Sequence, residues 1–221
     1  LYLILTGGEC TQYPGFTTLY PELCRMGFRI TLMSNAGAYS EEIRRVLRED
    51  PPCEAAITLY GGSNETYEKV TGDARGLDKA VENIRFYQSL GVPVTLTFTM
   101  IRQNALDHPK VARLSRELGI PYSLLTDLTP HVRDAAFSDV PGCRLSPAER
   151  AAVACHPPEE TELALKNAAE LEKLLSDFVP PAADPAAEPQ LNACVGSYSS
   201  AAVLWNGDMN TCLSLAGDRC Y

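Results

Sequence analysis

The sequence predicts an α/β protein built on parallel strands. Apolar runs rich in β-branched residues recur from Leu1 to Leu125, and each run is followed by a helical stretch. Glycine ends two of these helical stretches shortly before the next run, which is the usual junction from helix to strand. Crossovers of this length force neighbouring strands to be parallel. The expected products are a doubly wound sheet or a full or partial barrel.

Each element has its own local signal. The expected strands are LYLIL from Leu1, RITLM from Arg29, AAITL from Ala55, VTLTFTM from Val94 and YSLL from Tyr122. Ser40 is the expected cap of the helix EEIRRVLRE. A second, amphipathic helix over 77–90 should stop at Gly91, and a third over 109–118 should stop at Gly119.

The character of the chain changes in its last third. A helical region is expected from Pro147 to Phe178, and the proline-rich segment that follows cannot sustain a helix or a central strand. Beyond it, small residues and cysteines dominate, and VLW followed by NGD is typical of a hairpin turn between two short strands. We therefore expect a domain over 1–179, a linker over 180–190 and a second small domain over 191–221.

Composition excludes several classes of function. The 19 Lys and Arg against 28 Asp and Glu give a net charge of -9, without a basic run interleaved with aromatics, so no nucleic-acid partner is expected. No window approaches the length of a membrane span. The eight cysteines lie far apart in a core-forming sequence, which indicates thiols or metal ligands in a reducing, cytoplasmic setting.

A candidate ligand-binding loop follows the first expected strand. Gly7-Gly8-Glu9 stands at the carboxyl edge, where barrels and α/β sheets keep their active sites. The glycines let a ligand approach the backbone, and the glutamate can accept hydrogen bonds from an ammonium group. A tight turn with an acidic residue at a helix start explains these residues about equally well.

Two more segments end the next strands, and the three together resemble a known family. Ser34-Asn35-Ala36 ends the second strand, and Thr58-Leu59-Tyr60-Gly61-Gly62 ends the third. Taken singly, both would be ordinary loops. In this order and spacing the chain resembles the radical S-adenosylmethionine (radical SAM) superfamily, whose members carry Gly-Gly-Glu-Pro, Thr-Asn-Gly and Ser-Leu-Asp/Tyr-Gly after successive strands.

The resemblance covers essentially the whole chain. It extends through ETYEKVTG, through FTMIRQN and through RLSPAER from Arg144, all typical of peptide-modifying members. It implies a partial (β/α)6 TIM-like barrel whose first strand is missing, so that the run at Leu1 is the second strand. We therefore expect the sequence to begin inside a domain.

The resemblance also implies a set of site residues. Gly7, Gly8 and Glu9 would hold the amino group of S-adenosylmethionine. Asn35 and Thr58 would lie near its ribose and carboxylate, and Lys69 could pair with that carboxylate. In three places the chain departs from the family pattern: Cys10 replaces proline, Ala36 replaces glycine and Thr58 replaces serine. The first two leave the local backbone geometry open.

A second resemblance involves cysteines near the end of the chain. Cys194 is followed by twelve residues, Gly207, four residues and Cys212. This spacing resembles the opening half of the SPASM domain, which implies that Cys194 and Cys212 ligate an auxiliary iron–sulfur cluster. Two buried free thiols are the alternative. Cys220 has no assigned role, and the remaining cysteines are interpreted as structural, except Cys10, which stays open.

The motif for the catalytic cluster does not occur in this chain. Radical SAM enzymes hold a [4Fe-4S] cluster on Cys-x3-Cys-x2-Cys, and the resemblance places these cysteines before Leu1, so the chain by itself should be inactive. The implied reaction is reductive cleavage of S-adenosylmethionine, with an electron from flavodoxin or ferredoxin, to a 5′-deoxyadenosyl radical that abstracts hydrogen.

The sequence is compatible with three functions. The first is a maturase acting on a side chain of a peptide or protein. The second is a radical SAM enzyme with a small-molecule substrate, similar to the molybdenum-cofactor cyclases. The third is a barrel without a cluster that only binds a peptide or a nucleotide. The substrate and the bond formed are not encoded in any motif of the chain.

Overall fold

A parallel sheet forms the body of the protein. The structure is a computed structural model that describes residues 1–128, 140–176, 202–203 and 209–210. Five strands pair in the order β1-β2-β3-β4-β5, and every pairing between them is parallel. Their bounds are β1 Tyr2–Leu5, β2 Arg29–Ser34, β3 Glu54–Leu59, β4 Val94–Thr99 and β5 Tyr122–Leu125. All five expected strands are confirmed.

Helices connect the strands. Between β1 and β5 these are η1 Cys10–Gln12, α1 Phe16–Arg25, α2 Glu41–Glu49, α3 Asn64–Thr71, α4 Gly76–Ser89, η2 Ala105–Asp107 and α5 His108–Leu118. The capping predictions hold: the Ser40 hydroxyl accepts a hydrogen bond from the Ile43 amide, and Gly119 ends α5 in the left-handed conformation at φ 67°. Local sequence signals therefore set where these helices begin and end.

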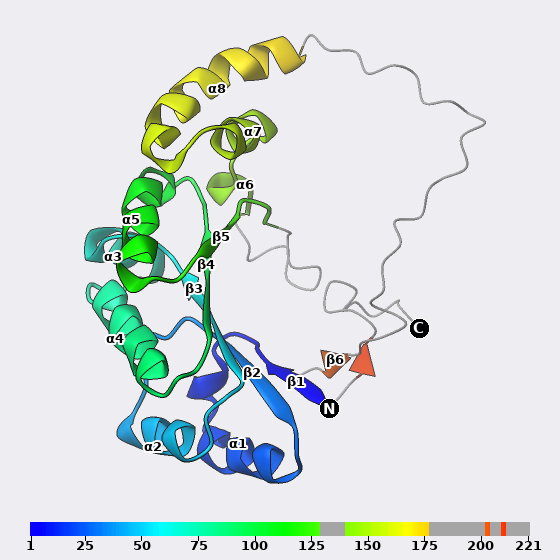
Figure 1. Cartoon of the computed structure of the whole chain (residues 1–221). Coiled ribbons are helices and arrows are strands. Elements are labelled where there is room, and N and C mark those ends of the chain that lie inside the picture. The colour runs from blue at the N-terminus through cyan, green and yellow to red at the C-terminus, as the bar shows by residue number, and fades with distance from the viewer. Residues whose placement is uncertain (129–139, 177–201, 204–208, 211–221) are drawn as a thin grey trace, which may run out of the picture. The chain divides into compact units, whose positions relative to one another are not determined.

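The strand order decides between the two expected architectures. A doubly wound sheet reverses its strand order part-way and carries helices on both faces. Here the strands follow one another in chain order without reversal, and α1 to α5 cover one face of the sheet (Figure 1). Sequential order with one helical face is the arrangement of a barrel wall. The fold is thus α/β and consistent with part of a TIM-like barrel.

The core lies between the sheet and these helices. Along β2, β3 and β4 alternate side chains are buried against the helices, as the two-residue period of a strand requires. Members of this core include Leu32, Ile57, Leu96 and Phe98, each at most 1% exposed. The other face of the sheet carries the intervening, partly exposed side chains, so the sequence alternation also determines which residues can line a site.

The chain after β5 is helical but interrupted. Instead of one region from Pro147 to Phe178, the structure has α7 Pro147–Cys155, η4 Pro158–Glu160 and α8 Thr161–Ser176. The break falls where Pro157 holds an extended backbone at φ -66°, ψ 156°. A short helix, α6 Val140–Cys143, precedes α7. None of the helices in the described ranges is long and apolar enough to cross a membrane.

The chain divides into two compact units. One consists of Leu1–Asp127 with Cys143–Glu172, and the other of Leu128–Gly142 with Lys173–Tyr221. In the second, β6 Ala202–Val203 pairs antiparallel with β7 Met209–Asn210, on either side of the predicted hairpin turn. The expected linker 180–190 and the cysteines Cys194, Cys212 and Cys220 lie outside the described residues.

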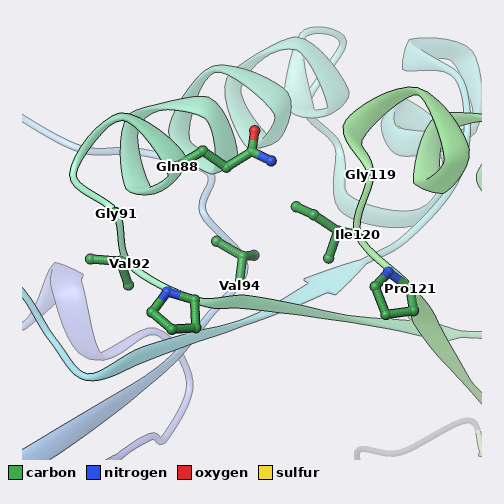
Figure 2. Close-up of a pocket in the computed structure, with 8 residues that line it drawn as sticks. Gln88, Gly91, Val92, Val94, Gly119, Ile120 and Pro121 are labelled. Carbon is green, nitrogen blue, oxygen red and sulfur yellow. The ribbon is translucent and has the colours of Figure 1, made fainter.

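One cavity lies at the amino edge of the sheet. It has a volume of about 430 Å³ and is formed where the turns before β4 and β5 meet the end of α4 (Figure 2). Its lining residues are Gln88, Gly91, Val92, Pro93, Val94, Gly119, Ile120 and Pro121. Parallel α/β proteins bind their ligands at the carboxyl edge, so this cavity is not the candidate site.

Asn104 ties two strand ends together at that carboxyl edge. Its side-chain amide donates to the Tyr60 carbonyl oxygen at 2.9 Å and to the Thr99 carbonyl oxygen at 2.9 Å. Its side-chain oxygen accepts from the Ile101 amide at 2.8 Å. The residue is only 2% exposed, so each bond replaces one that water would otherwise make. The loops after β3 and β4 are therefore held in fixed relation.

We predict that Asn104→Ala destabilises the fold. The substitution leaves two carbonyl oxygens and one amide without this buried partner, which should lower the free energy of unfolding by about 3 kcal/mol. Urea denaturation followed by circular dichroism measures this change. Gln103→Ala, at the exposed neighbouring position, should cost less than about 0.5 kcal/mol. Equal losses in the two variants would contradict a bridging role for Asn104.

Candidate functional site

Glu9 lies in the loop between β1 and η1, and this loop is open on its outer side. Gly7 adopts φ 128°, a backbone conformation that only glycine takes easily. Beyond the adjoining residues, a Cβ atom added at Gly7 or at Gly8 would meet no atom within 4 Å. The loop therefore presents bare backbone beside free space, which is what close approach by a ligand requires.

The Glu9 carboxylate joins the ends of two neighbouring strands. Its Oε1 accepts hydrogen bonds from the Thr11 hydroxyl at 2.7 Å, the Ser34 hydroxyl at 2.9 Å and the Thr11 amide at 3.3 Å. Its Oε2 accepts from the Asn35 amide at 2.7 Å. Thr11 belongs to η1, which Glu9 caps, and Ser34 ends β2. The carboxylate thus fixes the loop after β1 against the loop after β2.

One acceptor position on this carboxylate stays free. A carboxylate offers about four lone-pair positions, two on each oxygen. Oε1 is fully engaged, whereas Oε2 has a single donor, Asn35, among the described residues. Glu9 is partly exposed, so this remaining position is accessible to a donor from outside the protein. The two interpretations left open by the sequence are compatible: one oxygen builds the turn, and the other can accept a ligand.

The loop after β2 is held in an unusual conformation. Ala36 is the only non-glycine among the described residues with a positive φ, at 52°, and it stands where the family pattern has glycine. Its amide donates to the Ser34 hydroxyl at 2.9 Å, and its carbonyl oxygen accepts from the Asn83 amide group at 2.7 Å. These bonds hold the glycine-like conformation despite the alanine side chain. The departure at Ala36 therefore keeps the backbone geometry that a glycine would give.

A row of hydroxyl groups crosses the face of the sheet opposite the helices. The strand register pairs Thr58 with Thr97 and Thr97 with Ser123. Ile57 and Leu59 are buried toward the helices, so Thr58 points to the other face. Thr97 and Ser123 share that face because partners in a parallel register point the same way. The row can offer donors and acceptors to a polar ligand.

Asp107 organises the loop after β3. Its Oδ2 accepts from the Gly62 amide at 2.9 Å and the Ser63 hydroxyl at 2.8 Å, and its Oδ1 pairs with Lys110 at 2.6 Å. Burial raises the pKa of Asp107, but these hydrogen bonds outweigh it and hold the pKa below its usual value. The residue therefore stays ionised at neutral pH and clamps the Gly61-Gly62 segment to the start of α5.

Cys10 is a protonated thiol beside the candidate loop. Burial, together with the charge of Glu9, raises the pKa of Cys10 to about 12. Its sulfur lies 3.5 Å from the Met33 carbonyl oxygen, to which the thiol can donate. Thiolates, not thiols, ligate metals and attack electrophiles. Cys10 in this state therefore contributes packing and a weak hydrogen bond.

Lys69 is not brought to this cluster. It lies in α3, where its side chain is 62% exposed and pairs with Glu65 at 3.0 Å. No hydrogen bond or ion pair within the described ranges connects Lys69 to Glu9, Asn35 or Thr58. Its assignment to the ligand carboxylate remains a prediction without geometric support. In the same ranges, no three His, Cys, Asp or Glu side chains gather closely enough to hold a metal ion.

Comparison with known proteins identifies the family. The model of the radical SAM superfamily matches residues 1–115, a range that contains the Glu9 loop and the ends of β2, β3 and β4. This is more than half of the chain. The chain belongs to the radical SAM superfamily. The resemblance inferred from the three loop segments is thereby confirmed at the level of the family.

Similar sequences include proteins named as probable cyclases. A probable GTP 3′,8-cyclase of Saccharolobus islandicus is 30% identical over 127 residues, which are 57% of this chain and 41% of that protein. A protein of the same name from Metallosphaera sedula is 28% identical over 127 residues, or 57% of this chain and 40% of that protein. The chain thus spans about two fifths of the length of these relatives.

Solved structures share the fold at low identity. Streptococcus suis SuiB bound to S-adenosylmethionine superposes with a TM-score of 0.65 and 12% identity, over 99% of this chain and 50% of SuiB. The protein anSMEcpe with bound AdoMet and the Kp18Cys peptide gives a TM-score of 0.51 and 16% identity, over 79% of this chain and 48% of that one. At these identities the likeness establishes the radical SAM fold alone.

Several residues of the candidate site carry no signal in the sequence motifs. The alternating threonines of VTLTFTM indicate that Thr97 lies on one face of β4, but nothing marks it as a neighbour of Thr58. Asn104 and Asp107 are short polar residues of a kind common in turns. Only the folded chain reveals that Asp107 reaches back 45 residues to Gly62.

We predict that Cys10 resists alkylation. Because its raised pKa leaves little thiolate, iodoacetamide should modify Cys10 at least about a hundredfold more slowly than the exposed Cys155 between about pH 7 and 9. The rate should keep rising by about tenfold per pH unit above pH 9 and level off only near the pKa of Cys10. Peptide-resolved mass spectrometry after timed quenching measures both rates. Comparable rates at neutral pH would contradict the buried, protonated thiol.

Proposed function

We propose that this chain is the S-adenosylmethionine-binding part of a radical SAM enzyme that modifies a side chain of a peptide or protein. The observation that carries the proposal is the free acceptor position on Glu9 Oε2, beside the open Gly7-Gly8 backbone. The cofactor would supply a 5′-deoxyadenosyl radical for hydrogen abstraction. The residues of this chain would bind, orient and shield it.

Each proposed contact has a physical reason. Glu9 Oε2 would accept a hydrogen bond from the amino group of S-adenosylmethionine, since a charged donor and acceptor make the stronger kind of hydrogen bond. Gly8 would let the ligand lie against the backbone. Asn35 and Thr58 would stand near the ribose and carboxylate, from the ends of neighbouring strands. Lys69 would need a rearranged side chain to reach that carboxylate, because it now pairs with Glu65.

The catalytic [4Fe-4S] cluster would be held by cysteines outside this chain. We propose that the native gene encodes Cys-x3-Cys-x2-Cys within about one strand and loop upstream of Leu1. The free edge of β1 supports this, because β1 stands at the end of the strand order and pairs only with β2 in the described sheet. A preceding strand would pair with this edge. Without that motif in the native gene, the catalytic proposal would be wrong.

A peptide or protein substrate is supported by two observations. The first is the segment RLSPAER, which resembles peptide-modifying members; its capping box of Ser146 and Glu149 sets only the start of α7. SuiB, which has been solved with its precursor peptide SuiA, matches the fold over 99% of the chain. Flavodoxin or ferredoxin is the proposed electron donor, in a cytoplasmic setting. An auxiliary cluster in a SPASM-like domain would complete the protein.

A small-molecule substrate is the second candidate. It is favoured by the 30% identity to the probable GTP 3′,8-cyclase, which is higher than the identity to any of the solved peptide-modifying structures described above. The aligned region amounts to 41% of that relative, so more than half of it has no counterpart in the alignment. The two candidate functions use the same barrel and differ in the class of substrate.

We predict that a peptide, and not GTP, stimulates cofactor cleavage. The full-length protein would be reconstituted anaerobically, reduced with dithionite and supplied with either GTP or a peptide encoded by a neighbouring short reading frame. Substrate accelerates cleavage when its hydrogen is abstracted, so 5′-deoxyadenosine should accumulate at least about tenfold faster with the peptide. Chromatography with mass detection measures the product. Stimulation by GTP alone would favour the cyclase-like candidate instead.

We predict that Gly8→Val weakens S-adenosylmethionine binding by about tenfold or more while leaving the fold intact. The branched side chain would fill the space into which the ligand must come, but it meets no other protein atom within 4 Å where it branches from the backbone. Calorimetry on the full-length reconstituted protein measures the affinity, and thermal unfolding controls for stability. Gly8→Ala should cause a smaller loss. Unchanged affinity in Gly8→Val would place the ligand elsewhere.

We predict that Cys194 and Cys212 ligate an auxiliary iron–sulfur cluster in the full-length protein. Thiolate ligation couples the local fold to the cluster, so Cys194→Ala and Cys212→Ala should each lose auxiliary iron while the barrel stays folded. Iron analysis and Mössbauer spectra after anaerobic reconstitution test this. Cys155→Ala is a control at an exposed cysteine. Full iron content and parental spectra in both variants would mean that these cysteines are core thiols.

A further inference from the structure

A line of hydroxyl groups runs from the buried core to Glu9. The Tyr87 and Tyr39 hydroxyls lie 2.7 Å apart, the Tyr39 hydroxyl is 3.0 Å from the Ser34 hydroxyl, and Ser34 is 2.9 Å from Glu9 Oε1. Tyr87 belongs to α4 and is fully buried, and Tyr39 lies in the segment between β2 and α2. The line therefore connects a helix in the core to the carboxylate at the edge of the sheet.

The direction of these hydrogen bonds follows from counting donors. Ser34 accepts from the Ala36 amide and from the Tyr39 hydroxyl, which occupies both of its lone pairs. Its only hydrogen must then go to Glu9. Since Tyr39 has already donated to Ser34, the bond between the tyrosines must be donated by Tyr87. Every hydroxyl in the line therefore points toward the carboxylate.

Both tyrosines are fixed as donors. Burial raises the pKa of Tyr39 and of Tyr87, so both hydroxyls keep their protons across the physiological range. Their rings pack edge to face at 5.9 Å. Tyr20, a buried tyrosine of the same core, has a different partner: its hydroxyl donates to the Asp50 backbone oxygen at 2.7 Å, which is a structural contact. The line from Tyr87 ends instead on the Glu9 carboxylate, whose Oε2 accepts only from the Asn35 amide among the described residues and keeps one acceptor position free.

We propose that Tyr39 is a positioning residue for S-adenosylmethionine, acting through Ser34 on Glu9, with Tyr87 as the next member of the relay. This inference rests on the proposed function, in which Glu9 Oε2 receives the amino group. Aligned hydroxyls polarise one another, so the donor that reaches Oε1 is stronger than an isolated serine. The relay thereby keeps Oε1 turned to the protein and Oε2 turned to the ligand. Neither tyrosine of this relay belongs to the Gly7-Gly8-Glu9 motif.

The test uses two ligands that differ only in the group that Glu9 would bind. Affinities for S-adenosylmethionine and for its analogue without the α-amino group are measured by calorimetry on the full-length reconstituted protein. Tyr39→Phe should weaken binding of S-adenosylmethionine by about fivefold, as the loss of one hydrogen bond in the line. The deaminated analogue should bind the variant as well as it binds the parent. Tyr20→Phe, the matched control, should change neither affinity.

Two further variants separate the possible failures. Ser34→Ala interrupts the same line and should reproduce the selective loss, and adding Tyr39→Phe to it should cause no further loss of selectivity. Glu9→Gln should abolish the preference for the amino group. If Glu9→Gln weakens binding of S-adenosylmethionine but not of the deaminated analogue, and Tyr39→Phe and Ser34→Ala do not have this effect, the relay is wrong and the proposed function stands. If Glu9→Gln weakens binding of both ligands equally or of neither, the proposed function fails and the relay with it.

Discussion

The hydrogen bonds accepted by the Glu9 carboxylate are the interaction on which this site depends. Four N–H and O–H donors from two short segments, Thr11 and Ser34-Asn35, converge on it, and they connect the loop after β1 to the loop after β2. A partly buried carboxylate is costly unless it is hydrogen-bonded, so these contacts both offset its burial and fix its position. Because one oxygen is saturated and the other is not, the same residue builds the turn and leaves an acceptor facing outward.

The remaining strand ends are held by a second pair of residues. Asn104 bonds the backbone after β3 and after β4, and Asp107 fixes the Gly61-Gly62 segment. Both lie in the connection between β4 and α5, so one connection controls the geometry of two loops. With Glu9 at one end and these two residues at the other, the carboxyl edge is preorganised before any ligand arrives. Preorganisation of this kind lowers the cost of binding.

Much of the fold was predictable from the sequence, whereas the contacts that make the site were not. Hydrophobic alternation and glycine stops located all five strands of the main sheet, because both signals are local. Local signals alone left a barrel wall and a doubly wound sheet open; the family resemblance favoured the barrel, and the strand order confirms it. Tyr39 and Tyr87 are 48 residues apart, and their contact depends on how α4 packs. Lys69 is the opposite case: the family resemblance assigned it to the site, but in the structure it pairs with Glu65 and has no described contact with Glu9, Asn35 or Thr58.

The most direct measurement is a crystal structure of the full-length, cluster-loaded protein with S-adenosylmethionine bound. We expect the amino nitrogen of the ligand within about 3 Å of Glu9 Oε2. We also expect the contacts of Oε1 with Thr11 and Ser34 to be unchanged. An amino group bound away from Glu9, or a carboxylate whose two oxygens bond to the protein alone, would contradict the role of Glu9 as the anchor of this site.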